Sequence, residues 1–397
     1  MQSILIRAAS YFDGDKFHPE NAGPYLIAVR DGRIESVAQN SPDAPVNMVT
    51  GFVMPGLVDA HVHIFLDGGE LDPDKRNAYL NAGHEEMMGV AWRNIARTSR
   101  SGVTLVRDAG DRHGINHTMR DELRGDPAAL VSLRSAGMGV KRAKRYGSFI
   151  ARDVGSIEEI PAVIQELAAA SDDVKVILTG IIDFEAGAVK GAPQFNVEEL
   201  QCVIAEARRQ GRKTLAHCSG AEGLKMAVEA GIGSIEHGFF MTRELLPRMA
   251  DKGIAWIPTF SPVHFQWARP ELARWRQATI DNLRRILDSH LEHVALAHKA
   301  GVEIVAGSDA GSPGVEHGAA LIDELFHFLA AGLPMEEVLR SATSRPRRLW
   351  NAPSVNIEKG ARAELILFDF SPFADPNSLR RPEMVVSSHT SQKLSHS

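Results

Sequence analysis

The sequence predicts an α/β fold in which a (β/α)8 TIM-like barrel is joined to a small β-sandwich domain. Two observations predict it: eight short apolar runs alternate with amphipathic stretches, and strand-like pieces without helices stand near both ends. Strands that alternate with helices pair in parallel, and eight such units can close into a barrel. The pattern alone leaves a doubly wound open sheet as the alternative. A chain of 397 residues suits one barrel with a small accessory domain.

The expected barrel covers residues 55–349. Its amphipathic stretches include 197–210, 223–230 and 284–300, which have helical periodicity. The runs expected to form its strands are 57–64, 104–107, 130–134, 174–178, 214–217, 234–237, 255–258 and 302–308.

Residues 1–54 and 350–397 differ from this pattern. They contain strand-like pieces at 4–8, 26–30, 33–37 and 364–370. Neither end is large enough for a core of its own. We therefore expect the two ends to pair into one small β-sandwich domain with the barrel inserted between them. The polar tail after about residue 386 is expected to be frayed.

Composition narrows the possible partners. A net charge of -6 with mixed signs argues against nucleic acid, which requires a concentrated basic face. The two cysteines, Cys202 and Cys218, provide no disulfide framework. The first residues lack the pattern of a signal peptide, and no apolar run reaches the roughly 18 residues of a spanning helix. We expect a cytoplasmic homo-oligomer that acts on a small molecule, without a membrane partner.

The most informative motif is Asp59-Ala60-His61-Val62-His63, at the end of the first expected barrel strand. Alternate residues of a strand share a face, so His61 and His63 project together. Two imidazoles on one face suit zinc or a similar metal. An isolated pair of this kind is about as often incidental as it is a metal site. Its position favours a metal site, because barrel active sites lie at the carboxyl ends of the strands.

Three further strand ends carry ligand-type residues: His217 after the fifth strand, His237 after the sixth and Asp309 after the eighth. Each alone is a weak signal. Core packing does not explain ligand-type residues at four strand ends, so together they predict a metal centre.

Lys175 stands among apolar residues of the fourth expected strand. Burial of its ammonium group would be costly, unless the tip reached solvent or an acidic partner. The sharper hypothesis is that Lys175 reacts with carbon dioxide. The resulting carbamate would be an anionic ligand able to bridge two cations.

These motifs give the chain a resemblance to the metal-dependent amidohydrolase superfamily, and within it to the imidazolonepropionase-like branch that includes Xaa-Pro dipeptidases and zinc carboxypeptidases. The opening signature is the run at 52–63, FVMPGLVDAHVH, and the resemblance extends over nearly the whole chain. The later motifs that match in order are Val174-Lys175-Val176, Ala216-His217, Glu236-His237-Gly238 and Ser308-Asp309-Ala310.

The resemblance implies two divalent ions, with zinc favoured and manganese, iron or cobalt as alternatives. His61 and His63 would hold the first ion with Asp309. His217 and His237 would hold the second, and a carboxylated Lys175 would join both. A shared water would then attack an amide carbonyl. Asp309 would move the proton as general base and then general acid, unless it is a ligand only.

Substrate contacts are where the sequence departs from these relatives. The dipeptidase branch has a carboxylate-binding tyrosine two residues after the fifth-strand histidine, where this chain has Ser219. It also has a Gly-His-Gly motif where this chain has the basic run 138–147, MGVKRAKRYG. Both departures put dipeptide cleavage in doubt. Within that run, Arg145 and Tyr146 are candidate substrate contacts. The alternative, which is the commoner one, is a solvated loop.

The leading expectation is hydrolysis of a cyclic amide, an N-acyl amino acid or a small peptide. An esterase, lactonase or organophosphate hydrolase would use the same centre. A deaminase is disfavoured, because His217 lacks the His-x-x-Glu pattern of such enzymes. A non-catalytic scaffold is also disfavoured, because all six ligand positions, His61, His63, Lys175, His217, His237 and Asp309, are filled.

Overall fold

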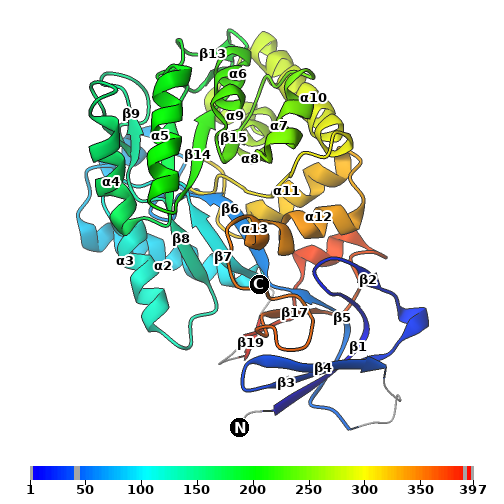
Figure 1. The fold of residues 1–397 in the computed structure, drawn as a ribbon. Helices are drawn as coiled ribbons and strands as arrows, with labels where there is room; N and C mark the ends of the chain where they lie inside the picture. The colour runs from blue at the N-terminus through cyan, green and yellow to red at the C-terminus, as the bar shows by residue number, and fades with distance from the viewer. Residues whose placement is uncertain (1–2, 40–44, 388–390, 395–397) are drawn as a thin grey trace.

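The computed structural model describes residues 3–39, 45–387 and 391–394. A large part made of parallel strands and surrounding helices is joined to a smaller all-β part near the two chain ends (Figure 1). The predicted α/β class is therefore confirmed. Within the described ranges, every helix is too short or too polar to cross a bilayer.

The parallel strands belong to two hydrogen-bonded groups. A backbone bond of 2.7 Å from Asp172 N to Ser135 O connects the groups. In the second group, the fourth to seventh predicted strands lie side by side in the order in which they occur along the chain. In a doubly wound sheet, the strand order would change direction at one point. The first group is β6 (Leu57–Val62), β7 (Val103–Asp108) and β8 (Ser132–Ser135), and the second is β10 (Ala151–Asp153), β9 (Gly139–Lys141), β11 (Asp173–Ile177), β14 (Lys213–Cys218), β15 (Ser234–His237) and β16 (Ala255–Ile257).

The expected eighth strand, 302–308, is wrong as a regular strand. Its backbone bonds go to several partners: Trp256 N donates to Glu303 O, Ala60 N to Ala306 O and Ala306 N to Ser341 O. Only an isolated bridge, between Trp256 and Ile304, forms in this segment. The segment connects β16 with β6 without a continuous ladder to either, and it carries the chain to Asp309.

The helices lie around the outside of the parallel strands (Figure 1). The helical patterns at 197–210, 223–230 and 284–300 are confirmed as α5, α6 and α10. α5 begins at a capping box in which Asn196 and Glu199 accept from each other's backbone N–H groups. The helices are α1 (Pro73–Tyr79), α2 (His84–Arg100), α3 (Ile115–Gly125), α4 (Ile160–Ala170), α5 (Val197–Arg209), α6 (Ala221–Ala230), α7 (Leu245–Lys252), α8 (Ser261–Ala268), α9 (Pro270–Ala273), α10 (Gln277–Lys299), α11 (Ala319–Ala330), α12 (Met335–Ser341) and α13 (Ser344–Leu349).

Two short features modify the βα connections. β9, which pairs with β10, occupies residues 139–141 of the run for which a solvated loop was the commoner interpretation, so the loop interpretation is wrong for these three residues. After β11, a small hairpin of β12 (Ile182–Asp183) and β13 (Ala188–Val189) projects from the carboxyl end of the strand.

The terminal segments pair into one eight-stranded sheet, in the order β19-β18-β17-β5-β1-β3-β4, with β2 beside β1. The sequence predicted a sandwich, but one strand, β5, pairs in parallel with β1 on one edge and antiparallel with β17 on the other. Strands from both chain ends therefore belong to one hydrogen-bonded sheet. The strands are β1 (Ser3–Phe12), β2 (Phe17–His18), β3 (Tyr25–Arg30), β4 (Arg33–Gln39), β5 (Met48–Pro55), β17 (Leu365–Phe368), β18 (Met384–Val386) and β19 (Ser391–Lys393).

The prediction of a frayed tail is wrong for residues 391–393, because β19 pairs with β18. The remaining tail residues, 388–390 and 395–397, lie outside the described ranges. The sheet has its own apolar cluster, which includes Ile6, Ile27 and Leu365. A buried network fixes it to the parallel part: Arg347 Nη2 donates to Glu364 Oε2 at 2.7 Å, and Thr104 Oγ1 donates to the same oxygen at 3.0 Å.

Candidate metal centre

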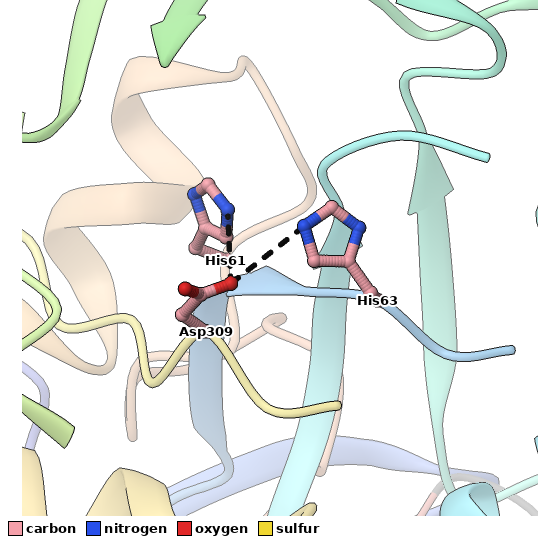
Figure 2. Close-up of side chains that lie close together, drawn as sticks. All are labelled: His61, His63 and Asp309. Carbon is pink, nitrogen blue, oxygen red and sulfur yellow. Dashed lines mark ion pairs between the residues drawn. The ribbon is translucent and has the colours of Figure 1, made fainter. Parts of the chain in front are cut away.

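His61 and His63 project from the carboxyl end of β6 toward Asp309, as the alternation of a strand predicts (Figure 2). The Nε2 atoms of both imidazoles lie 3.6 Å from the same oxygen, Asp309 Oδ1. Both histidines are buried, with exposures of 1% and 6%. One ligand atom from each of the three residues lies within 4.8 Å of the other two.

This geometry fits a metal ion better than a hydrogen-bonded cluster. A separation of 3.6 Å is longer than a nitrogen–oxygen hydrogen bond. It is close to the spacing of ligands that each lie about 2 Å from a common zinc ion. The donor set of two imidazoles and one carboxylate also suits a divalent transition metal.

The other ring nitrogens of the two histidines have fixed partners. His61 Nδ1 lies 2.6 Å from Glu236 Oε2, and His63 Nδ1 lies 2.9 Å from the carbonyl oxygen of Gly110. Because these oxygens accept, each Nδ1 carries the proton and each Nε2 is left with its lone pair. The lone pairs therefore face Asp309, which is the arrangement that ligation requires.

His217 and His237 form a second pair at the ends of β14 and β15, with ring centroids 4.5 Å apart. The ring of His237 lies 5.0 Å from that of His61, so the two pairs adjoin. His237 Nδ1 lies 2.7 Å from Thr259 Oγ1. The structure thus brings the four predicted imidazoles to one place, although only His61 and His63 share a compact group with Asp309.

Lys175 is 1% exposed on β11. Burial lowers the pKa of its amine to about 8, while the nearby carboxylates of Glu236 and Asp309 act in the opposite direction. The side chain therefore belongs electrostatically to the same centre, and solvent does not compensate its charge.

Burial governs the protonation of the imidazoles. Desolvation, followed by the charge of Lys175, lowers the pKa of His63 to about 4 and that of His217 to about 3. The pKa values of His61 and His237 are also well below the usual range, chiefly because of desolvation. All four rings are consequently neutral at pH 7, which is the form that binds metals.

Asp309 is held by the backbone and by one side chain. Its N–H donates to His61 O at 2.7 Å, and Ser312 Oγ donates to Asp309 Oδ2 at 3.2 Å. Its φ of 57° is in the left-handed region, which is uncommon for residues other than glycine and is a strain often found at active sites. Desolvation raises the pKa of this carboxyl to about 7.

A cavity of about 330 Å³ opens beside the centre and is lined by His217, His237 and Asp309. Of the three predicted substrate contacts, Tyr146 and Ser219 line this cavity. Arg145 is exposed, does not line it and donates to Ala192 O. A larger cavity of about 800 Å³ lies between α1 and α2, and its lining contains none of the six predicted ligands.

Sequence reasoning missed the residues that hold the ligands. Glu236, which is fully buried, binds His61 and also accepts from Arg107 Nη2 at 2.8 Å and from Ser234 Oγ at 2.5 Å. Asp59 accepts from Ser308 N at 2.9 Å and fixes the approach to Asp309. The usable signal was present: Asp59 and Glu236 each stand within two residues of a predicted ligand, in runs that are otherwise apolar.

Replacement of Thr259 by Val should weaken metal binding by about tenfold, because His237 Nδ1 loses its hydrogen-bond partner at nearly constant side-chain volume. Competition with a chromophoric chelator measures the affinity. Thermal unfolding of the metal-free protein is the control, and it should change little. Unchanged affinity would show that Thr259 does not orient His237.

Buried imidazoles and a carboxylate at the ends of parallel strands, beside a cavity, are the arrangement of a metal-dependent hydrolase. The sequence profile of the Amidohydrolase family matches residues 52–391. The chain therefore belongs to the amidohydrolase family, and it is a hydrolase that acts on C–N bonds.

Individual relatives are distant but extend along most of the chain. An uncharacterized protein of Mycobacterium tuberculosis is 28% identical and covers 90% of this chain and 89% of its own length. The ochratoxinase of Aspergillus niger is 26% identical, covering 84% of this chain and 73% of that protein. A solved Xaa-Pro dipeptidase with methionine in its active site has a TM-score of 0.82 and 24% identity, and covers 99% and 100% of the two chains. This last likeness concerns the fold.

Proposed function

We propose that the protein is a binuclear metal-dependent hydrolase that cleaves an amide-type C–N bond in a cyclic amide, an N-acyl amino acid or a small peptide. The observation that carries the proposal is the convergence of His61 Nε2 and His63 Nε2 on Asp309 Oδ1, with the pair His217 and His237 beside them. Relatives named ochratoxinase and dihydroorotase support the reaction class.

In this proposal, His61, His63 and Asp309 hold one divalent ion, and His217 and His237 hold the other. Zinc is the preferred metal, because neutral imidazoles supply most of the ligands. When bound, such ions supply Lewis acidity and allow water to act as a nucleophile near neutral pH.

Lys175 completes the centre as a carbamate. Its amine nitrogen forms a bond to the carbon of CO₂ and loses one proton, which leaves an anionic oxygen donor between the two ligand sets. The burial of Lys175 beside Asp309 and Glu236 supports this step, because a permanent ammonium group would be costly in such a site.

Side chains of this protein transfer the proton from the attacking water to the leaving amine. Asp309 Oδ1 faces the ligand nitrogens and borders the cavity, so it can accept the proton of the attacking water and return it to the leaving amine. Tyr146 lines the cavity, with its ring centroid 5.2 Å from that of His217, and in this proposal it donates a hydrogen bond to a substrate oxygen.

The fold proposal is a closed eight-stranded barrel over residues 55–349, with a small β-domain formed from 1–54 and 350–397. Backbone bonds from Ala60 N to Ala306 O and from Trp256 N to Glu303 O support closure through the irregular eighth segment. Closure would bring the ligands from all sides to one mouth.

The metal-loaded protein should hydrolyse at least one of an N-acyl amino acid, a dipeptide and a cyclic amide, and a chelator should remove the activity. Metal analysis should give two ions per chain, and fewer in Lys175→Ala. A ¹³C carbamate signal from protein equilibrated with ¹³CO₂ should also be lost in that variant. Activity confined to esters or lactones would reject the proposed reaction, and a protein without stoichiometric metal would reject the centre.

A further inference from the structure

The cavity beside the metal centre has an apolar wall. The wall comes from the βα connections after β11 and β15, from the start of α8 and from the turn after Asp309. It extends to the mouth, where Ile181 is 42% exposed. Its apolar members are Ile181, Ile182, Phe184, Phe239, Pro262, Val263 and Pro313.

The hairpin of β12 and β13, which contributes Ile182 and Phe184 to this wall, is held against its neighbours. Asn282 Nδ2 on α10 donates to the carbonyls of Phe184 and Glu185, at 3.1 and 2.9 Å. The ring of Phe184 packs edge-on against Trp275 at 6.1 Å. Trp275 Nε1 in turn donates to Gln266 Oε1, which orients another lining residue. The wall is therefore a preformed surface.

Apart from the candidate ligands, the polar lining residues are neutral. Three of their hydroxyl groups already have hydrogen-bond partners. Ser219 Oγ accepts from Phe239 N, Thr259 Oγ1 is bonded to His237, and Ser312 Oγ donates to Asp309. Tyr146 and the amide N–H groups of Gln266 remain to bind a substrate. Such groups can recognise a carbonyl or a neutral amide.

Among the residues that the structure describes, neither a lysine nor an arginine lines the cavity. Three of the four basic residues in the run 138–147 have partners elsewhere, and the fourth, Lys144, is exposed and does not line the cavity. Lys141 Nζ lies 2.5 Å from Asp153, Arg142 pairs with Glu199, and Arg145 donates to Ala192 O. On the hairpin, Lys190 Nζ lies 3.8 Å from Asp183. A free carboxylate that entered this cavity would lose its water without gaining a cationic side chain.

We propose that the cavity selects substrates whose group beside the scissile bond is neutral and apolar, with an aliphatic or aromatic side chain and no free carboxylate. The inference rests on the proposed function, because it assigns the substrate class of the same site. It separates the protein from enzymes that bind the terminal carboxylate of a peptide.

Two matched pairs of compounds test the proposal on either side of the amide bond. N-Benzoyl-leucinamide and N-benzoyl-leucine differ in a carboxylate on the amine side, and butyranilide and succinanilic acid differ in one on the acyl side. With the metal-loaded protein, kcat/KM should favour the neutral member of each pair by at least about tenfold. For compounds that are not cleaved, Kd from calorimetry should show the same order.

Two variants test whether the wall is responsible. Ile181→Arg adds a cation at the exposed edge and should raise the relative kcat/KM or affinity of the carboxylate members by about tenfold. Phe184→Ala should lower the kcat/KM or affinity for the compounds with aromatic or leucyl groups by about tenfold. The matched control is Phe370→Ala, because Phe370 is 70% exposed and does not line the cavity. This variant should have the same kcat/KM or affinity as the wild type for every compound.

The outcomes separate the two proposals. Hydrolysis with equal or better use of the carboxylate members would overturn the selectivity and leave the hydrolase proposal standing. Tighter binding of the neutral members without hydrolysis of any amide would overturn the hydrolase proposal and leave the selectivity standing. A selectivity unchanged in both wall variants would also overturn the inference, because the wall would then not contact the substrate.

Discussion

Asp309→Asn should lower kcat by about 10²–10⁴-fold, which is the usual contribution of a general base. The carboxylate oxygen Oδ1 faces both His61 and His63, while Oδ2 accepts from Ser312 and the backbone N–H is bound to His61 O. The amide of asparagine keeps the size and the oxygen donor but cannot take a proton at neutral pH. Steady-state kinetics with the amide substrate found in the screen measures the effect.

Metal analysis must accompany the kinetics, because Asp309 is also a proposed ligand. We expect the variant to retain most of its metal. Asp323→Asn is a suitable control, since Asp323 lies in an exposed pair with Arg380 and away from the cavity lining. Near-wild-type turnover of the Asp309→Asn variant with full metal content would leave Asp309 as a ligand without a role in proton transfer.

Glu236→Gln should lower the free energy of unfolding of the metal-free protein by about 3–5 kcal/mol. Glu236 and Arg107 are both almost completely buried, and their side chains are 2.8 Å apart. The neutral amide would leave the guanidinium charge uncompensated, and its N–H₂ group would face either Arg107 or the Nδ1–H of His61. Denaturant unfolding measures the loss.

The same substitution should also weaken metal binding by about 10–100-fold, because His61 loses the carboxylate that fixes its orientation. Glu271→Gln provides the matched control. Its pair with Arg269 is exposed, so its loss should change the stability little. If Glu236→Gln unfolded at the same denaturant concentration as the control, the buried pair would not be a major support of the site.

The site residues that sequence could predict are those whose placement depends on local geometry. His61 and His63 share a face because a strand alternates, and His217 and His237 stand at strand ends because each apolar run stops there. The positioning contacts depend on long-range packing. His61 meets Glu236 across 175 positions and Glu236 meets Arg107 across 129, which no local period encodes.

The fold shows the same division. Most helices and strands follow from apolar periodicity, but the eighth segment does not become a strand, because its backbone groups are shared among three neighbours. Residues 391–393 are polar and were expected to fray, yet they pair through backbone groups that are indifferent to side-chain polarity. Arg145 stands in a basic run, and only the fold directs its guanidinium group to a carbonyl outside the cavity.

The position of β5 between β1 and β17 constrains how the molecule can assemble. Residues 48–55 can pair with β1 as soon as they leave the ribosome, whereas their other edge must wait for residues 365–368. Nearly the entire catalytic part is synthesised in that interval. Contacts between such distant positions form slowly, so the last ladder is expected to close late in folding. During synthesis, β5 therefore presents an unpaired edge that could recruit another strand, and nascent chains of this protein are expected to depend on chaperones at this stage.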